Sequence, residues 1–167
     1  ASGREVSGGA PLIIDKAIQA EAERLLPDGP VYVGFAPGAG GRHKCWPLER
    51  YCAVALDMAQ TGRVPVFLLG PNEADWMATI QAAVPTARLP LQECAVAVTP
   101  MLTIALAQRM SAALANDSGT GHMLAAADIA LLSLFGPTPA AKFAPATRLG
   151  RVIEARSFGG QSMDLIP

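Results

Sequence analysis

Short, uninterrupted apolar runs alternate with segments of helical periodicity along almost the whole of this chain. The runs fall at residues 31–36, 64–69, 111–115 and 129–135. Continuous apolar runs, unlike alternating ones, indicate strands that are buried on both faces. The sequence therefore predicts an α/β fold, with a Rossmann-like parallel sheet and helices on both of its faces.

The segments between these runs carry apolar residues at helical spacing. They predict helices at residues 14–25, 47–59, 73–83 and 102–109, and one more after residue 118. Weaker patterns predict short strands at 87–89 and 151–155, with a loop at 142–149 between the last two strands. We expect three parts: a linker or cloning remnant at 1–13, one α/β domain at 14–155, and a C-terminal tail at 156–167.

Composition excludes several classes of protein. The net charge is −1 and aromatic residues make up only 5% of the chain, which argues against a nucleic-acid-binding surface. No apolar run approaches the roughly 20 residues of a transmembrane segment. The three cysteines, Cys45, Cys52 and Cys94, are scattered, which favours a reducing compartment and neither a disulfide framework nor a zinc site.

Ligands of parallel α/β sheets bind beyond the carboxyl ends of the strands. The loops that follow the predicted strands should therefore meet in space, although they are far apart in sequence. These loops are residues 37–44, 70–73, 116–122 and 136–138.

The loop at 116–122 reads Asn-Asp-Ser-Gly-Thr-Gly-His and joins a strand to an Ala-rich helical start. Such a turn exposes successive backbone N–H groups, and the helix N-terminus adds partial positive charge, so together they suit an anion. Asp117 at its mouth could accept hydroxyl groups, as in a nucleotide sugar. The simpler interpretation is a helix cap by Ser118 or Asp117, with His122 as a packed structural residue.

The loop at 37–47 contains Gly38, which permits close backbone approach, and the cations Arg42 and Lys44, which could neutralise a phosphate. It matches neither the Walker loop nor the dinucleotide-binding fingerprint, and a solvated basic turn explains it equally well. Glu73 could hold a ribose or simply complement a helix N-terminus. Trp46 could stack on a base or fill the space beside the loop.

Three segments taken together carry a resemblance to a known family. They are Pro37-Gly38-Ala39 running into Lys44-x-Trp46-Pro47, Leu69-Gly70 followed by Glu73, and residues 116–138 with Asn-Asp-Ser-Gly, His122, Ala-Ala-Ala and Leu-Phe-Gly-Pro-Thr. Over about residues 14–155 the chain resembles the C-terminal half of bacterial lipopolysaccharide heptosyltransferases, which are ADP-heptose-using glycosyltransferases of the two-domain GT-B fold.

The resemblance implies a role for each matching residue. Lys44 would bind the donor pyrophosphate and offset the charge of the departing ADP, and Asp117 would hydrogen-bond the donor sugar; these two would be the catalytic residues of this half. The other donor-binding residues would be Gly38, Glu73 at the ribose, the backbone of Ser118, Gly119 and Thr120, and His122 as a brace of the loop. Neither a metal nor another cofactor is implied.

The chain also departs from the family's pattern. Cys45 replaces a second basic residue, Thr120-Gly121 replaces a common Pro-Met pair, and Asp128 and Ala130 stand where Gly and Pro are frequent. The N-terminal domain, which binds the acceptor and carries the catalytic base, is expected to be missing. The tail should stop before the family's last helix.

We therefore expect a nucleotide-sugar-binding domain of a cytoplasmic enzyme, peripheral to the inner membrane, that transfers heptose from ADP-heptose to a lipid-linked, lipopolysaccharide-type saccharide. The isolated domain should be inactive. Two alternatives remain: a GT-B transferase or epimerase that uses a UDP-sugar, and a nucleotide-binding module without catalytic activity.

Overall fold

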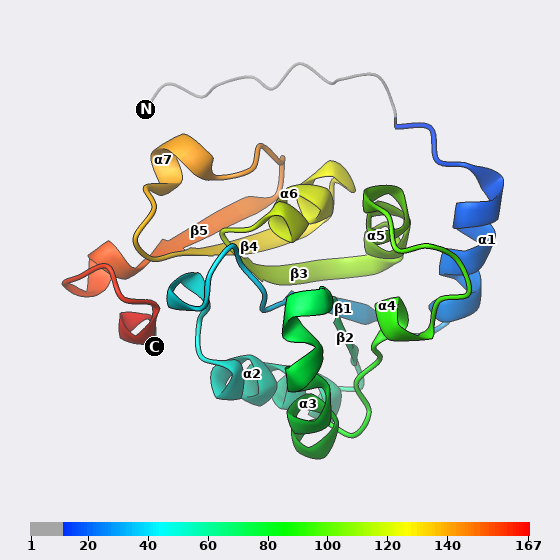
Figure 1. Cartoon of the computed structure of the whole chain (residues 1–167), viewed down its shortest axis with the longest axis horizontal. Coiled ribbons are helices and arrows are strands. Elements are labelled where there is room, and N and C mark those ends of the chain that lie inside the picture. The colour runs from blue at the N-terminus through cyan, green and yellow to red at the C-terminus, as the bar shows by residue number, and fades with distance from the viewer. Residues whose placement is uncertain (1–11) are drawn as a thin grey trace.

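Five parallel strands form one sheet in the computed structural model, which describes residues 12–167 (Figure 1). The strands are β1 (Tyr32–Ala36), β2 (Val64–Phe67), β3 (Met110–Asn116), β4 (Ala130–Phe135) and β5 (Gly150–Glu154). They lie in the order β2-β1-β3-β4-β5, with every neighbouring pair parallel. The predicted fold class is confirmed, and most of the predicted linker at 1–13 lies outside the described residues.

Helices cover both faces of this sheet. The α-helices are α1 (Lys16–Leu25), α2 (Leu48–Gln60), α3 (Met77–Ala83), α4 (Pro90–Glu93), α5 (Pro100–Ala107), α6 (Gly119–Ala126) and α7 (Ala140–Phe143). The 3-10 helices are η1 (Arg42–Lys44), η2 (Pro71–Trp76), η3 (Ala155–Phe158) and η4 (Met163–Leu165). Among residues 12–167, none of these helices is long and apolar enough to cross a membrane.

The core is divided by the sheet into two clusters. On one face α1, α5 and α6 pack on Ala113, Ala115 and Leu131. On the other face lie α2 and α3 (Figure 1). They cover Phe35 and Phe67, whose ring centroids lie 5.1 Å apart in a stacked pair. The continuous apolar runs of the sequence predicted strands that are buried on both faces. In the structure, β1 is buried along its whole length.

The predicted helices form with shifted ends. Asp15 and Thr99 cap α1 and α5 by accepting from Ala17 and Leu102 N–H groups, which fixes where these helices begin. The predicted helix at 73–83 is two elements, η2 and α3. The predicted helix at 102–109 begins earlier and ends at Ala107.

Three other local predictions were wrong in detail. Residues 87–89 form no strand of the sheet, because only Arg88 pairs there, in an isolated parallel bridge with Val66. The predicted loop at 142–149 overlaps the single-turn helix α7. The last strand is Gly150–Glu154, one residue earlier than predicted at each end.

The C-terminal residues pack against the domain despite their weak sequence pattern. Met163 and Ile166 are buried in the same cluster as α2 and α3. The carbonyl oxygen of Ile166 accepts hydrogen bonds from the indole of Trp46 and from Arg50. Residues 155–167 therefore support the start of α2, next to the loop that follows β1.

Candidate functional site

The loops beyond the carboxyl ends of β1, β2, β3 and β4 meet at one edge of the sheet, as the topology predicts. Asn116, the buried last residue of β3, connects two of them. Its amide nitrogen donates to the Pro37 carbonyl at 2.6 Å, and its amide oxygen accepts from the Trp46 backbone N–H at 3.2 Å. This double contact fixes the loop after β1 against the end of β3.

Lys44 and Asp117 face each other across this junction. The Nζ atom of Lys44 lies 3.4 Å from Oδ2 of Asp117, and the same oxygen accepts a 2.6 Å hydrogen bond from the hydroxyl of Thr138. The exposed fraction of the side chain is 28% for Lys44 and 13% for Asp117, so the pair is partly screened and still reachable from solvent. Three different loops therefore meet at one atom, because the Lys44 ammonium and the Thr138 hydroxyl both contact Oδ2 of Asp117.

Ser118 caps helix α6, as the simpler interpretation of this loop predicts. Its hydroxyl oxygen accepts from the Gly121 N–H at 3.2 Å. Asp117 is not the cap, because its side chain turns to Lys44 and Thr138. Within residues 12–167, the backbone N–H groups of Ser118, Gly119 and Thr120 find no acceptor. Three donors at a helix N-terminus thus remain available to an anion.

Glu73 bridges the loops after β1 and β2. One of its carboxylate oxygens accepts from the Gly70 N–H at 3.0 Å, which is the helix-capping role that the sequence allowed. A Cβ at Gly38 would lie 2.7 Å from the carboxyl carbon of Glu73, so a side chain at position 38 would displace the Glu73 carboxylate from its present place. Within the described part of the chain the other carboxylate oxygen accepts no hydrogen bond, and it can still receive a ligand hydroxyl.

A cleft of about 240 Å³ lies between these loops. Gly38, Glu73, Ser118, Gly119 and Thr120 all line it. A second depression of about 170 Å³ adjoins it and shares Glu73 and three neighbouring residues. The structure thus brings together, around one cleft, most of the residues that the sequence singled out.

Arg42 lines the second depression and contacts residues of η2. Its guanidinium lies 4.1 Å from the centre of the Trp76 ring and 2.9 Å from a carboxylate oxygen of Asp75. Arg42 therefore points toward η2 and away from the Lys44–Asp117 pair. Cys45 lines the same depression, and partial burial raises the pKa of its thiol, which disfavours the thiolate.

Neither His122 nor Trp46 lines the cleft. His122 is exposed, and its ring makes no hydrogen bond to any residue in 12–167, so nothing in the structure supports its expected role as a brace. Trp46 is only 6% exposed, and its ring packs edge-on against Tyr51. Trp46 fills the space beneath the loop and cannot stack on a ligand.

Sequence reasoning assigned no contact to Asn116 or Thr138. A polar residue that ends an apolar strand is a signal for Asn116, because a buried amide must find partners. For Thr138 the only signal was its place in a loop expected at the same sheet edge. Its partner, 21 residues away, could not be read from local pattern.

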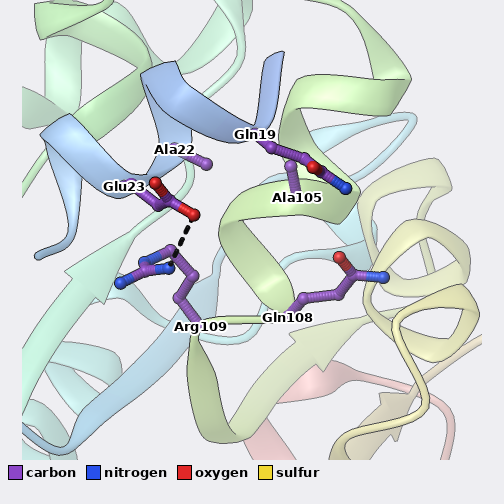
Figure 2. Close-up of a pocket in the computed structure, with 6 residues that line it drawn as sticks. All are labelled: Gln19, Ala22, Glu23, Ala105, Gln108 and Arg109. Carbon is purple, nitrogen blue, oxygen red and sulfur yellow. Dashed lines mark ion pairs between the residues drawn. The ribbon is translucent and has the colours of Figure 1, made fainter. Parts of the chain in front are cut away.

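Another depression, of about 250 Å³, lies at the opposite end of the sheet, between α1 and α5 (Figure 2). Figure 2 shows Glu23 reaching toward Arg109, which also pairs with Asp28 and donates to the Leu26 carbonyl. The positive charge of Arg109 is therefore already compensated. The depression itself lies at the amino ends of the strands. Among residues 12–167, no group of three or more His, Cys, Asp or Glu side chains could hold a metal ion.

Comparison with known proteins gives one family match. Residues 10–161 match the model of glycosyltransferase family 9 (heptosyltransferase). No curated protein sequence matches significantly.

Several solved structures share the fold. The glycosyl transferase family 9 protein of Veillonella parvula has a TM-score of 0.81 at 21% identity, over 98% of this chain and 52% of that one. The ADP-heptose LPS heptosyltransferase II of E. coli has a TM-score of 0.77 at 24% identity, over 93% and 48%. E. coli heptosyltransferase WaaC with ADP has a TM-score of 0.69 at 18% identity, over 89% and 44%. The chain thus spans about half the length of these relatives.

Proposed function

The chain belongs to glycosyltransferase family 9 (heptosyltransferase), and from this membership we propose that it is the donor-binding half of a heptosyltransferase. Its ligand would be a nucleoside diphosphate sugar, with ADP-heptose as the first candidate. The observation that carries the proposal is the cleft lined by Glu73 and by Ser118, Gly119 and Thr120, whose N–H groups find no acceptor within residues 12–167. The Lys44–Asp117 pair stands next to it, because Asp117 directly precedes Ser118.

The chemistry of the cleft matches the parts of such a donor. The N–H groups at the start of α6, with Lys44 beside them, would hold the pyrophosphate. Glu73 would accept ribose hydroxyls through the carboxylate oxygen that is not bonded to Gly70. Asp117 would accept a hydroxyl of the transferred sugar, and Gly38 would allow the nucleotide to approach the backbone.

In the proposed reaction, the bond between the anomeric carbon and the phosphate oxygen breaks while an acceptor hydroxyl attacks that carbon. Negative charge then develops on the departing ADP. The Lys44 ammonium and the aligned N–H groups would stabilise that charge, since fixed donors in a partly dehydrated cleft are already oriented. The acceptor's proton would pass to a base outside this chain.

The acceptor remains part of the proposal. Heptosyltransferases of this family are about twice as long as this chain, so the whole enzyme's acceptor site would require a second domain. We propose a lipid-linked, lipopolysaccharide-type saccharide as the acceptor, and a cytoplasmic location at the inner membrane. The family membership and the resemblance in sequence support these points.

The direct test is calorimetric titration of ADP, UDP and GDP into the 167-residue chain. We expect binding of ADP, with weaker binding of UDP and GDP. Tighter binding of UDP would favour a UDP-sugar enzyme. Absence of heat and of a thermal shift with every nucleotide at millimolar concentration would contradict the proposed donor site.

Titration of ADP-heptose tests the remaining alternative, a nucleotide-binding module without catalytic activity. If ADP binds and adding the sugar brings no gain in affinity, Asp117 does not recognise the sugar. The chain would then fit a nucleotide-binding module better than a glycosyltransferase half.

A further inference from the structure

We infer that Thr138 is a positioning residue that holds the Asp117 carboxylate in place while Lys44 leaves it for the diphosphate of a donor. The inference rests on the proposed function and adds to it a fixed partner, Thr138, and an exchangeable partner, Lys44. Both partners are defined by contacts to the same oxygen atom, Oδ2 of Asp117.

The two contacts differ in closeness. The Thr138 hydroxyl lies 2.6 Å from Oδ2, a full hydrogen bond in which the hydroxyl donates and the carboxylate accepts. The Lys44 ammonium lies at 3.4 Å, near the outer limit of an ion pair with hydrogen-bond character. The Lys44 contact is thus the weaker one and the one more easily exchanged.

The backbone around Thr138 and Asp117 is constrained on both sides. Thr138 stands between Pro137 and Pro139, whose rings fix the backbone dihedral φ. Gly136 lies against the C-terminal segment so closely that a Cβ there would meet the Met163 sulfur at 2.7 Å. The Asp117 N–H donates to the Leu134 carbonyl at 3.0 Å.

Lys44, in contrast, sits at the end of η1 on a flexible four-carbon stem. Its ammonium can therefore turn without movement of the sheet. A diphosphate at the N–H groups of Ser118, Gly119 and Thr120 would present more negative charge than one carboxylate, and Lys44 would follow it.

This exchange couples binding of the donor's diphosphate to recognition of its sugar. When Lys44 leaves, Oδ2 of Asp117 loses one donor and keeps Thr138. A hydroxyl of the transferred sugar can then donate to the vacated side of an already oriented carboxylate. Diphosphate binding would thereby improve recognition of the sugar, and the coupling must be reciprocal.

The first measurement needs no nucleotide. The chain has three lysines, Lys16, Lys44 and Lys142, so NMR of lysine labelled with ¹³C at Cε can follow Lys44 by itself. In Thr138→Val the freed carboxylate should rotate, and the Lys44 resonance should shift. Thr138→Ser, which keeps the hydroxyl, should restore the wild-type position. Inorganic pyrophosphate should move the same resonance in the wild type.

The matched control is Thr147→Val. The Thr147 hydroxyl is buried and has no hydrogen-bond partner among residues 12–167, so its loss removes a hydroxyl without changing the cleft. This variant should keep the wild-type Lys44 resonance and the wild-type affinities.

The second measurement compares ADP with ADP-heptose by calorimetry. Thr138→Val should weaken ADP-heptose binding about tenfold, the scale of one hydrogen bond to a charged group, and should weaken ADP less. Thr138→Ser should keep the wild-type preference for ADP-heptose over ADP.

The outcomes separate this inference from the proposed function. If no nucleotide binds to the wild type, the proposed function fails, and the Lys44 resonance in Thr138→Val and Thr138→Ser still decides the role of Thr138. If Thr138→Val leaves that resonance unchanged, or if Thr138→Ser shifts it as much, the hydroxyl does not position Asp117 and the inference is overturned.

Discussion

The Lys44 ammonium lies 3.4 Å from the Asp117 carboxylate across 73 residues of sequence, and this contact joins the loop after β1 to the loop after β3. Asp117 comes directly after β3, and Lys44 ends η1 in the loop that follows β1, so the contact depends on the parallel pairing of β1 with β3. A charged pair beside three available N–H groups is the feature on which the first prediction depends.

Replacement of Lys44 by alanine should weaken ADP binding by about 1.5–3 kcal/mol, the range for a hydrogen bond to a charged group. Calorimetry of ADP with the variant measures the loss. Lys142→Ala is the control, because Lys142 lies over the Phe143 ring and away from the cleft. Equal affinity of the wild type and the Lys44 variant would remove Lys44 from the site.

Replacement of Glu73 by glutamine should weaken ADP binding by about 1 kcal/mol, because a neutral amide oxygen accepts a ribose hydroxyl less strongly than a carboxylate does. The glutamine oxygen can still accept from Gly70, so the turn should persist. With 2′-deoxy-ADP the difference between wild type and variant should shrink. A penalty that is equal for both nucleotides would mean that Glu73 acts only on the loop.

The free energy of unfolding, measured at decreasing pH, should show how the Glu21 carboxylate stabilises the fold. The Arg24 side chain and the Ala95 N–H hydrogen-bond this carboxylate and lower its pKa from 4.5 to about 2. Because the pKa is lower in the folded state, the contact stabilises the fold fully above about pH 4.5. That stabilisation is lost as the pH falls toward 2.

The measurement is denaturant unfolding of Glu21→Gln and wild type between pH 6 and pH 2.5. The variant should be less stable at pH 6, and its stability should fall less with decreasing pH. Glu23→Gln, an exposed carboxylate on the same helix, is the control and should keep the wild-type slope. Parallel curves for wild type and Glu21→Gln would contradict the assigned pKa.

Asp128 occupies a backbone position that favours glycine. Its φ of 56° is left-handed, and Asp128 directly follows Ala127, the C-cap residue of α6. Asp128→Gly should raise the free energy of unfolding by about 0.5–1 kcal/mol, since relief of the strain exceeds the loss of the exposed ion pair with Arg148. Asp128→Ala should lower it, because alanine keeps the strain and loses the pair. Thermal unfolding of both variants measures the difference.

The parts of the fold that local pattern determines were predictable. Runs such as 31–36 and 129–135 are mostly apolar, and the glycine-rich loops after them indicated which sheet edge holds the cleft. The packing of Ile166 under Trp46 was not predictable, because it depends on a hydrogen bond between residues far apart in sequence. The same holds for Thr138, whose partner is known only once β3 and β4 are paired. His122 is exposed, so its role as a brace of the loop, which the resemblance implies, stays a prediction.

The strand order also has a kinetic consequence. Tyr32 of the early strand β1 pairs with Met110 of β3, so the centre of the sheet closes only after a long loop has been brought together. Loop closure of this kind slows folding, because its entropy cost precedes the contacts that stabilise the closed sheet. Since the cleft lies on the loops that flank this closure, it cannot form in a partly folded chain. A bound nucleotide should therefore slow hydrogen exchange of the amides throughout β1 and β3 as well as of those that touch it.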